Sequence, residues 1–195
     1  MIWISCILTE TALPTGLTEH QNHFSCNQGI YDIMNATISD SPNTETKRWK
    51  IALLNGLNMT SLGQRDKNVY GTIGSLQELE DLVSDTGAKL GVDIVAFHSN
   101  HEGDLVDFIE AATDIDAFMI NPGGLWRFGE PTNIAFEQAG KPFVEVHFAN
   151  IYATGDKSVY TDSALATTMG FRHYGYLGSL VALVAELNQG LLCSH

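Results

Sequence analysis

From Lys50 onward the chain alternates short apolar runs with longer segments in which apolar residues recur at helical spacing. The runs KIALLN, VDIVAFHS, AFMINPGG and PFVEVHFAN predict buried strands, and ALATTMGF predicts a weaker fifth strand. The intervening segments SLQELEDLVSDTGAKLG, EGDLVDFIEAATD and EPTNIAFEQAG predict helices, and GSLVALVAELNQG predicts a closing helix that stops at Gly190. Because parallel strands joined by helices require right-handed crossovers, the expected fold is an α/β domain whose parallel sheet is covered on both faces.

The length of 195 residues allows one sizeable core and is short for two. Residues 1–48 are polar and end in SDSPNTETKR, which has the turn-rich composition of a linker. We therefore expect an N-terminal extension over residues 1–48 and one domain over residues 49–195. Within the extension, His20, His23 and Cys26 stand three residues apart, which fits a polar surface segment or part of a metal site. Because no fourth ligand accompanies them, we predict no metal.

The formal net charge of -13 argues against a nucleic-acid or anionic-membrane partner, since both need a basic surface. Three widely spaced cysteines, Cys6, Cys26 and Cys193, imply no disulfide framework and fit a reducing compartment, so we expect a cytoplasmic protein. The opening MIWISCILTETALP is too short and interrupted for a membrane span. The expected partner is a small molecule.

Parallel sheets bind ligands at the carboxyl ends of their strands, which directs attention to the loops there. The loop after the first strand places Arg65 five residues before Tyr70. A guanidinium beside a phenol favours the phenolate, which would let Tyr70 act as a general base. The alternative is that both residues only pack in a surface loop.

The loop after the second strand, HSNHEGD, contains His101 and Glu102, and either Ser99 or Asn100 is expected to cap the helix that follows. In the fourth strand, Glu145 and His147 are two residues apart and therefore point to the same side of the sheet. A histidine at this strand end is well placed as a proton donor, although a structural role is the alternative.

Several of these motifs together resemble one known family. LLNGLNMTSLGQR with VYG, then SNHEGDLVDFI, INPGG and VEVHFAN, are similar in order and approximate spacing to the signature loops of type II 3-dehydroquinate dehydratases. The similarity is strong from Lys50 to about Asn150 and looser over the C-terminal helix. It implies a flavodoxin-like three-layer sandwich with a five-stranded parallel sheet, a homo-oligomer built of trimers and commonly a dodecamer, and no metal or organic cofactor. The implied reaction eliminates water from a cyclic β-hydroxy ketone through an enolate.

The resemblance also assigns roles to residues. Tyr70 matches the general base and Arg65 its activating cation, while Asn58 and Asn121 match residues that hold an enolate-stabilising water. His147, with Glu145 nearby, matches the general acid. The remaining residues expected to bind substrate are Gly123, Gly124, Trp126, Arg127, Phe128, Phe148, Ala149, His101 and Glu102.

The departures from the family pattern gather on substrate recognition. Arg127 stands where the family has a histidine, and Ala149 stands where it has a serine that binds the substrate carboxylate. Two family arginines are replaced by Thr154 and Ser158, and Ile134 replaces an aspartate that reaches a neighbouring subunit's site.

These losses predict a lyase that keeps its proton-transfer residues but has a less polar pocket and a substrate other than 3-dehydroquinate. The alternatives are a true 3-dehydroquinate dehydratase and a non-catalytic homologue. Whether Arg127 or Lys157 supplies the missing positive charge is left open.

Overall fold

The computed structural model describes residues 47–190, so the predictions for His20, His23 and the three cysteines lie outside the described residues. Its centre is a sheet of five parallel strands in the order β2-β1-β3-β4-β5. The strands are β1 (Lys50–Leu57), β2 (Asp93–His98), β3 (Ala117–Gly123), β4 (Phe143–His147) and β5 (Ala166–Met169). This order places the reversal of the sheet between β1 and β3, where flavodoxin-like folds bind their ligands.

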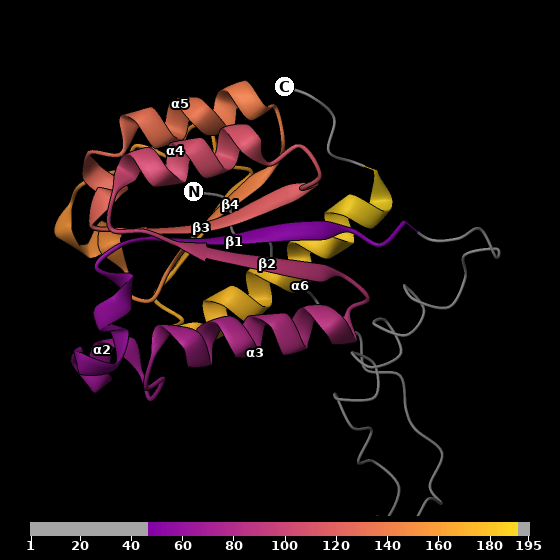
Figure 1. The fold of residues 1–195 in the computed structure, drawn as a ribbon. Helices are drawn as coiled ribbons and strands as arrows, with labels where there is room; N and C mark the ends of the chain where they lie inside the picture. The colour runs from indigo at the N-terminus through magenta and orange to yellow at the C-terminus, as the bar shows by residue number, and fades with distance from the viewer. Residues whose placement is uncertain (1–46, 191–195) are drawn as a thin grey trace, which may run out of the picture. The chain divides into compact units, whose positions relative to one another are not determined.

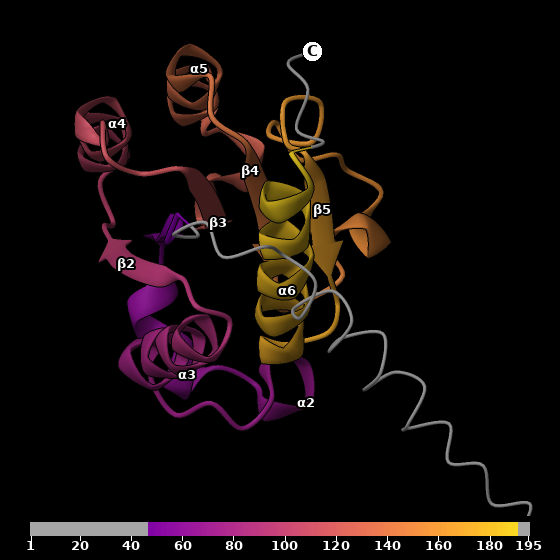
Figure 2. The ribbon, with the colours of Figure 1, turned by 90° about the vertical axis from the view of Figure 1, so that its right-hand side faces the viewer.

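Helices cover both faces of the sheet. Figure 1 shows α4 (Glu102–Ala111) and α5 (Glu130–Ala139) on one face and α3 (Leu76–Lys89) and α6 (His173–Gln189) on the other. The turned view in Figure 2 shows the same pairs separated by the strands. The predicted three-layer sandwich with a five-stranded parallel sheet is therefore confirmed.

Strand β1 is the centre of both halves of the core. Ile51 and Leu53 pack toward α3 and α6, whereas Ala52 and Leu54 pack toward α4 and α5, and all four are fully buried. A strand that is covered on both faces must be apolar on both faces, which explains the unbroken apolar run IALL.

One helix start and one helix cap differ from the prediction. Helix α6 begins at His173 rather than Gly178, because the fully buried Tyr176 packs in the core and tertiary contact outweighs the low helix propensity of the nearby glycines. Helix α4 has His101 at its N-cap, with no side-chain cap, so the predicted capping by Ser99 or Asn100 is wrong. Asn100 Oδ1 instead accepts a hydrogen bond of 2.8 Å from the backbone N–H of Asn58.

Four short elements that periodicity did not predict follow the carboxyl ends of β1, β3 and β4. They are the 3-10 helices η1 (Met59–Gln64), η2 (Gly124–Arg127) and η3 (Ile151–Thr154) and the single-turn helix α2 (Lys67–Tyr70). Elements of four to six residues are too short to show an apolar period. Together they surround the candidate site.

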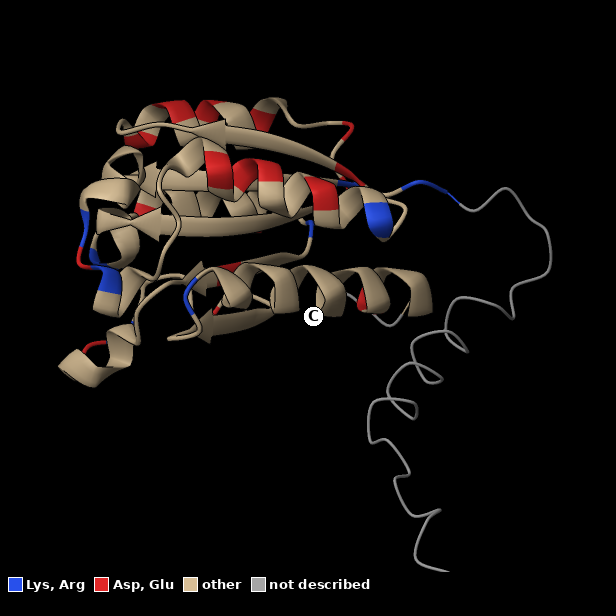
Figure 3. Ribbon diagram, turned by 90° about the horizontal axis from the view of Figure 1, so that it is seen from below, with Lys and Arg blue, Asp and Glu red and all other residues tan. Residues whose placement is uncertain are grey.

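Figure 3 shows acidic residues spread over the helices and only scattered basic ones across the described part of the chain. None of the helices formed by residues 47–190 combines the length and apolar character needed to cross a bilayer.

Candidate active site

A small cavity opens at the carboxyl edge of the sheet, where β1, β3 and β4 end. Its volume is about 90 Å³. The lining residues are Met59, Arg65, Tyr70, Asn121, Gly123, Trp126, His147, Phe148, Ala149 and Ile151. The loop after β1, the end of β3 and the end of β4 thus converge on one space, as the sheet topology predicts.

Tyr70 enters the cavity from the end of α2, and Arg65 lies beside it. The guanidinium carbon of Arg65 is 4.8 Å from the centroid of the Tyr70 ring, close enough for a cation–π contact. Arg65 Nη2 also donates a hydrogen bond of 2.6 Å to the backbone carbonyl of Asn58, which fixes the guanidinium in place. The structure therefore brings the proposed base and its cation together.

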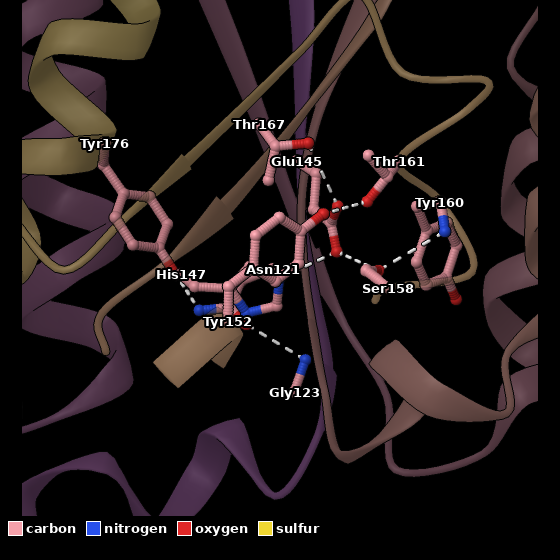
Figure 4. A network of polar contacts seen from close by, with 10 residues as sticks. All are labelled: Asn121, Gly123, Glu145, His147, Tyr152, Ser158, Tyr160, Thr161, Thr167 and Tyr176. Atoms are coloured by element: carbon pink, nitrogen blue, oxygen red, sulfur yellow. Dashed lines mark hydrogen bonds and ion pairs between the residues drawn. The ribbon is translucent and has the colours of Figure 1, made fainter. Parts of the chain in front are cut away.

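Glu145 and His147 form a buried pair on β4, and His147 lines the cavity. His147 Nε2 lies 2.7 Å from Glu145 Oε1, and the exposed fractions of the two residues are 4% and 0%. Ser158 Oγ donates to the same carboxylate oxygen, and Thr167 Oγ1 donates to Oε2 over 3.3 Å, as Figure 4 shows. A buried carboxylate is costly unless such partners satisfy it. Because Nε2 is bonded to Glu145, Nδ1 is the ring nitrogen of His147 that can exchange a proton with a substrate.

Asn121 is held in one orientation by two hydrogen bonds. Its Nδ2 donates to the hydroxyl of Tyr176 over 2.7 Å, and its Oδ1 accepts from the backbone N–H of Gly123 over 3.0 Å. Burial raises the pKa of Tyr176 far above its ordinary value, so this phenol stays neutral. Its hydroxyl keeps the Asn121 side chain in one orientation. Figure 4 shows Tyr176 reaching Asn121 from α6.

The backbone conformation and the close packing at position 123 require a glycine. Its φ is +58°, and a Cβ built there would lie 2.0 Å from the carbonyl oxygen of Leu57. Only glycine allows β3 to pass this close to the end of β1 while turning into η2.

The outer rim of the cavity is built by η2 and by the segment after η3. The Arg127 guanidinium stacks 4.2 Å from the Trp126 ring centroid and forms an ion pair with Asp156. The backbone N–H of Val159 donates to the carbonyl of Trp126 over 3.0 Å, joining the same two segments. Lys157 pairs with Asp162. Neither Arg127 nor Lys157 lines the cavity.

Other residues predicted at the site lie outside the cavity. Glu102 Oε1 accepts hydrogen bonds from the backbone N–H and hydroxyl of Thr132 at 3.2 and 3.1 Å, so it joins the starts of α4 and α5. His101 is exposed, and Phe128 is 75% exposed. Asn58 and Gly124 also lie outside the lining. Substrate contact by these residues stays a prediction.

Sequence reasoning missed several residues that shape the site. Met59 and Ile151 line the cavity, while Thr167 and Tyr176 support its polar groups. The sequence marks Ser158 only as a serine where the family has an arginine, and its local sequence does not indicate a contact with Glu145. Within residues 47–190, no three His, Cys, Asp or Glu side chains gather as a metal site.

Comparisons with known proteins agree with this arrangement. Residues 49–184 match the family model described as dehydroquinase class II. The 3-dehydroquinate dehydratase of Clostridium acetobutylicum is 34% identical over 144 residues, covering 72% of this chain and 99% of that protein. The corresponding protein of Thermotoga maritima is 35% identical over 143 residues, covering 72% of this chain and 98% of its own length. The solved type II dehydroquinase from Propionibacterium acnes superposes with a TM-score of 0.65 at 28% identity, over 71% of this chain and 99% of that one.

Proposed function

Because the chain belongs to the class II dehydroquinase family, we propose that it is a 3-dehydroquinate dehydratase that forms 3-dehydroshikimate. The observation that carries this proposal is the placement of Tyr70 and His147 on one cavity, each with its own partner. Arg65 lies against Tyr70, and Glu145 is hydrogen-bonded to His147. An elimination needs a base and an acid at different points of one pocket, and this arrangement provides both.

The proposed reaction follows from these positions. The Tyr70 phenolate, stabilised by Arg65, removes a proton from the carbon next to the ketone, and the electron pair moves onto the ketone oxygen as an enolate. The enolate then re-forms the ketone while the β-hydroxyl leaves, and that hydroxyl takes a proton from His147 and departs as water. Asn121 polarises the region where the enolate charge develops. Tyr70 ends protonated and His147 deprotonated, and solvent exchange restores both.

Glu145 supports the acid step without touching the substrate. Its buried carboxylate is hydrogen-bonded to His147 Nε2 and fixes the orientation of the ring. Ser158 and Thr167 hold the carboxylate in turn. Proton donation therefore begins from a defined geometry.

A second candidate is the same chemistry on a less polar substrate, as the departures from the family pattern predict. Arg65 is the only lysine or arginine among the described residues that line the cavity, and it is already engaged with Tyr70 and Asn58. Arg127 is paired with Asp156. This leaves no obvious partner for a substrate carboxylate, which favours the second candidate. The named relatives are 3-dehydroquinate dehydratases, which favours the first more strongly.

One assay separates the candidates. Purified protein is incubated with 3-dehydroquinate, and the ultraviolet absorbance of the conjugated enone is followed. We expect turnover, and we expect Tyr70→Phe to lower kcat by about 10² to 10⁴, the usual contribution of a general base. Tyr174→Phe, an exposed tyrosine on α6, is the matched control and should leave kcat unchanged.

Absence of turnover in the wild-type protein would contradict the first candidate. Mass spectrometry of small molecules that copurify with the protein would then test the second candidate. The trimer-based assembly and the cytoplasmic location remain proposals that sedimentation and fractionation can check.

A further inference from the structure

Arg172, just before α6, has a backbone conformation that disfavours every residue except glycine. Its φ is 55° and its ψ is -141°. Among residues 47–190, Asn58 is the other non-glycine residue with positive φ, but its ψ of 9° lies in the left-handed region that asparagine tolerates. The angles of Arg172 lie close to a region populated essentially by glycine alone. An arginine there lowers stability, so its side chain calls for an explanation.

The side chain of Arg172 reaches the helix that carries Tyr70. Its Nη2 donates a hydrogen bond of 2.9 Å to the backbone carbonyl of Asn68 in α2. The last carbonyls of a helix have no partner within it, and arginine side chains can satisfy them. The Arg172 side chain also passes over Gly71, where a built Cβ would lie 3.0 Å from Arg172 Cδ. Arg172 therefore closes the C-terminal end of α2.

Helix α2 needs an external restraint. It has four residues, and none of them is buried. A single turn is not stable on its own, because too few hydrogen bonds form for the backbone entropy lost. The main-chain bonds from Tyr70 N to Asp66 O at 2.9 Å and from Gly71 N to Lys67 O at 2.9 Å hold the turn together.

The backbone of Arg172 is bonded to Phe148, whose ring lies near that of Tyr70. The backbone N–H of Arg172 donates to the carbonyl of Phe148 over 3.1 Å. The Phe148 ring lies 6.0 Å from the Tyr70 ring, centroid to centroid, and both residues line the cavity. Arg172 thus connects the wall of the cavity, through its main chain, to the end of α2, through its side chain.

We propose that Arg172 is a positioning residue that fastens α2 to the start of α6 and so holds Tyr70 over the cavity. The chain accepts a strained backbone at this point because the strained conformation directs the guanidinium to Asn68. The effect on catalysis rests on the proposed function, in which Tyr70 is the base. The contact that fastens α2 to the start of α6 does not depend on the proposed function.

The test combines three measurements on Arg172→Gly and Arg172→Ala. Hydrogen exchange of the Tyr70 and Gly71 amides should be about fivefold faster in both variants, the effect of losing roughly one hydrogen bond. The kcat on 3-dehydroquinate should fall about tenfold in both, with KM changing less than twofold. The melting temperature of Arg172→Gly should exceed that of Arg172→Ala by about 2 to 6 °C, because glycine relieves the strain.

Arg48→Ala is the matched control, since Arg48 is an exposed arginine paired with Asp93 and remote from α2. It should change neither amide exchange nor kcat. Unchanged exchange at Tyr70 and Gly71 in Arg172→Ala would overturn the proposal, whatever the activity. If the wild-type protein does not turn over 3-dehydroquinate, the proposed function fails, but the exchange measurement still decides whether Arg172 fastens α2.

Discussion

The two sides of the cavity are held in different ways. The acid side, which consists of Glu145, His147, Ser158 and Thr167, is built from hydrogen bonds around a carboxylate that is 0% exposed. The rim, which consists of Trp126, Arg127, Phe128 and Asp156, is held by a stacked guanidinium and an ion pair. The side chains of Arg127 and Asp156 are 41% and 55% exposed.

This difference explains where the sequence is free to change. Leaving a buried carboxylate without a partner is costly, so substitution on the acid side affects stability and chemistry together. An exposed ion pair contributes little to folding, so the rim can change with almost no effect on stability. Of the predicted departures from the family pattern, Arg127 falls on the rim, where a change can alter recognition and leave the fold intact. Ser158 falls on the acid side, where it donates to Glu145.

The largest expected effect is at His147. His147→Gln keeps a polar side chain near Glu145 but removes the proposed general acid, so kcat should fall by about 10² to 10⁴. The comparison with the rim is made by Arg127→Gln, which should change kcat less than about tenfold because Arg127 does not line the cavity. Steady-state kinetics measures both variants. Equal losses of kcat would contradict the division into two sides.

The next effect concerns stability. Ser158→Ala removes a buried donor to Glu145 and should lower the free energy of unfolding by about 1 to 3 kcal/mol. Thr154→Ala, at an exposed position in η3 next to the rim, should stay within about 0.5 kcal/mol of wild type. Urea denaturation followed by circular dichroism gives both values. If the two variants unfold at the same midpoint, the acid side is not the more constrained region.

The two sides of the cavity also show which features of the molecule can be predicted from the sequence. The sheet and its covering helices follow from periodicity, and the Glu145–His147 pair follows from the two-residue repeat of a strand. These features depend on residues close together in the chain. The bonds from Ser158 to Glu145 and from Tyr176 to Asn121 join distant segments, and no local pattern specifies which serine or tyrosine will meet the site.

The partners of exposed charged residues are even less predictable from the sequence. Glu130 is the acidic residue nearest to Arg127 along the chain, but the arrangement of the loops pairs Arg127 with Asp156. Because exposed pairs are weak, the sequence carries little signal that fixes them. The structure shows the pairing of Arg127 with Asp156, and contact between Arg127 and a substrate stays a prediction.

A smaller effect on binding tests whether Arg127 can meet the carboxylate of 3-dehydroquinate. Asp156→Asn breaks the ion pair of Arg127 and should change the free energy of unfolding by less than about 1 kcal/mol. The released guanidinium gains freedom to meet an anionic substrate, so KM for 3-dehydroquinate should fall by a few fold if its carboxylate binds on this side. Steady-state kinetics with Asp162→Asn, which releases Lys157 instead, is the control. A KM that rises in Asp156→Asn would show that the ion pair itself shapes the binding site.

The smallest expected effect concerns Glu80, a second buried carboxylate, which has fewer hydrogen-bond partners than Glu145. Glu80 on α3 is 8% exposed, but its described side-chain partners are fewer than those of Glu145: Asn55 Nδ2 donates to it over 3.2 Å, and His98 Nδ1 lies 4.0 Å away. Burial raises the pKa of Glu80 above its ordinary value of 4.5, and the Asn55 hydrogen bond opposes that rise only in part.

The sign of the pH effect at Glu80 follows from its raised pKa. The folded protein holds the proton of Glu80 at a higher pH than the unfolded chain does, so this residue lowers stability as pH rises through the interval above 4.5. Glu80→Gln removes that contribution, and its free energy of unfolding should fall less than that of wild type over the same interval. Urea titrations at a series of pH values measure the difference in slope. Identical slopes would mean that burial does not raise the pKa of Glu80 in the folded protein.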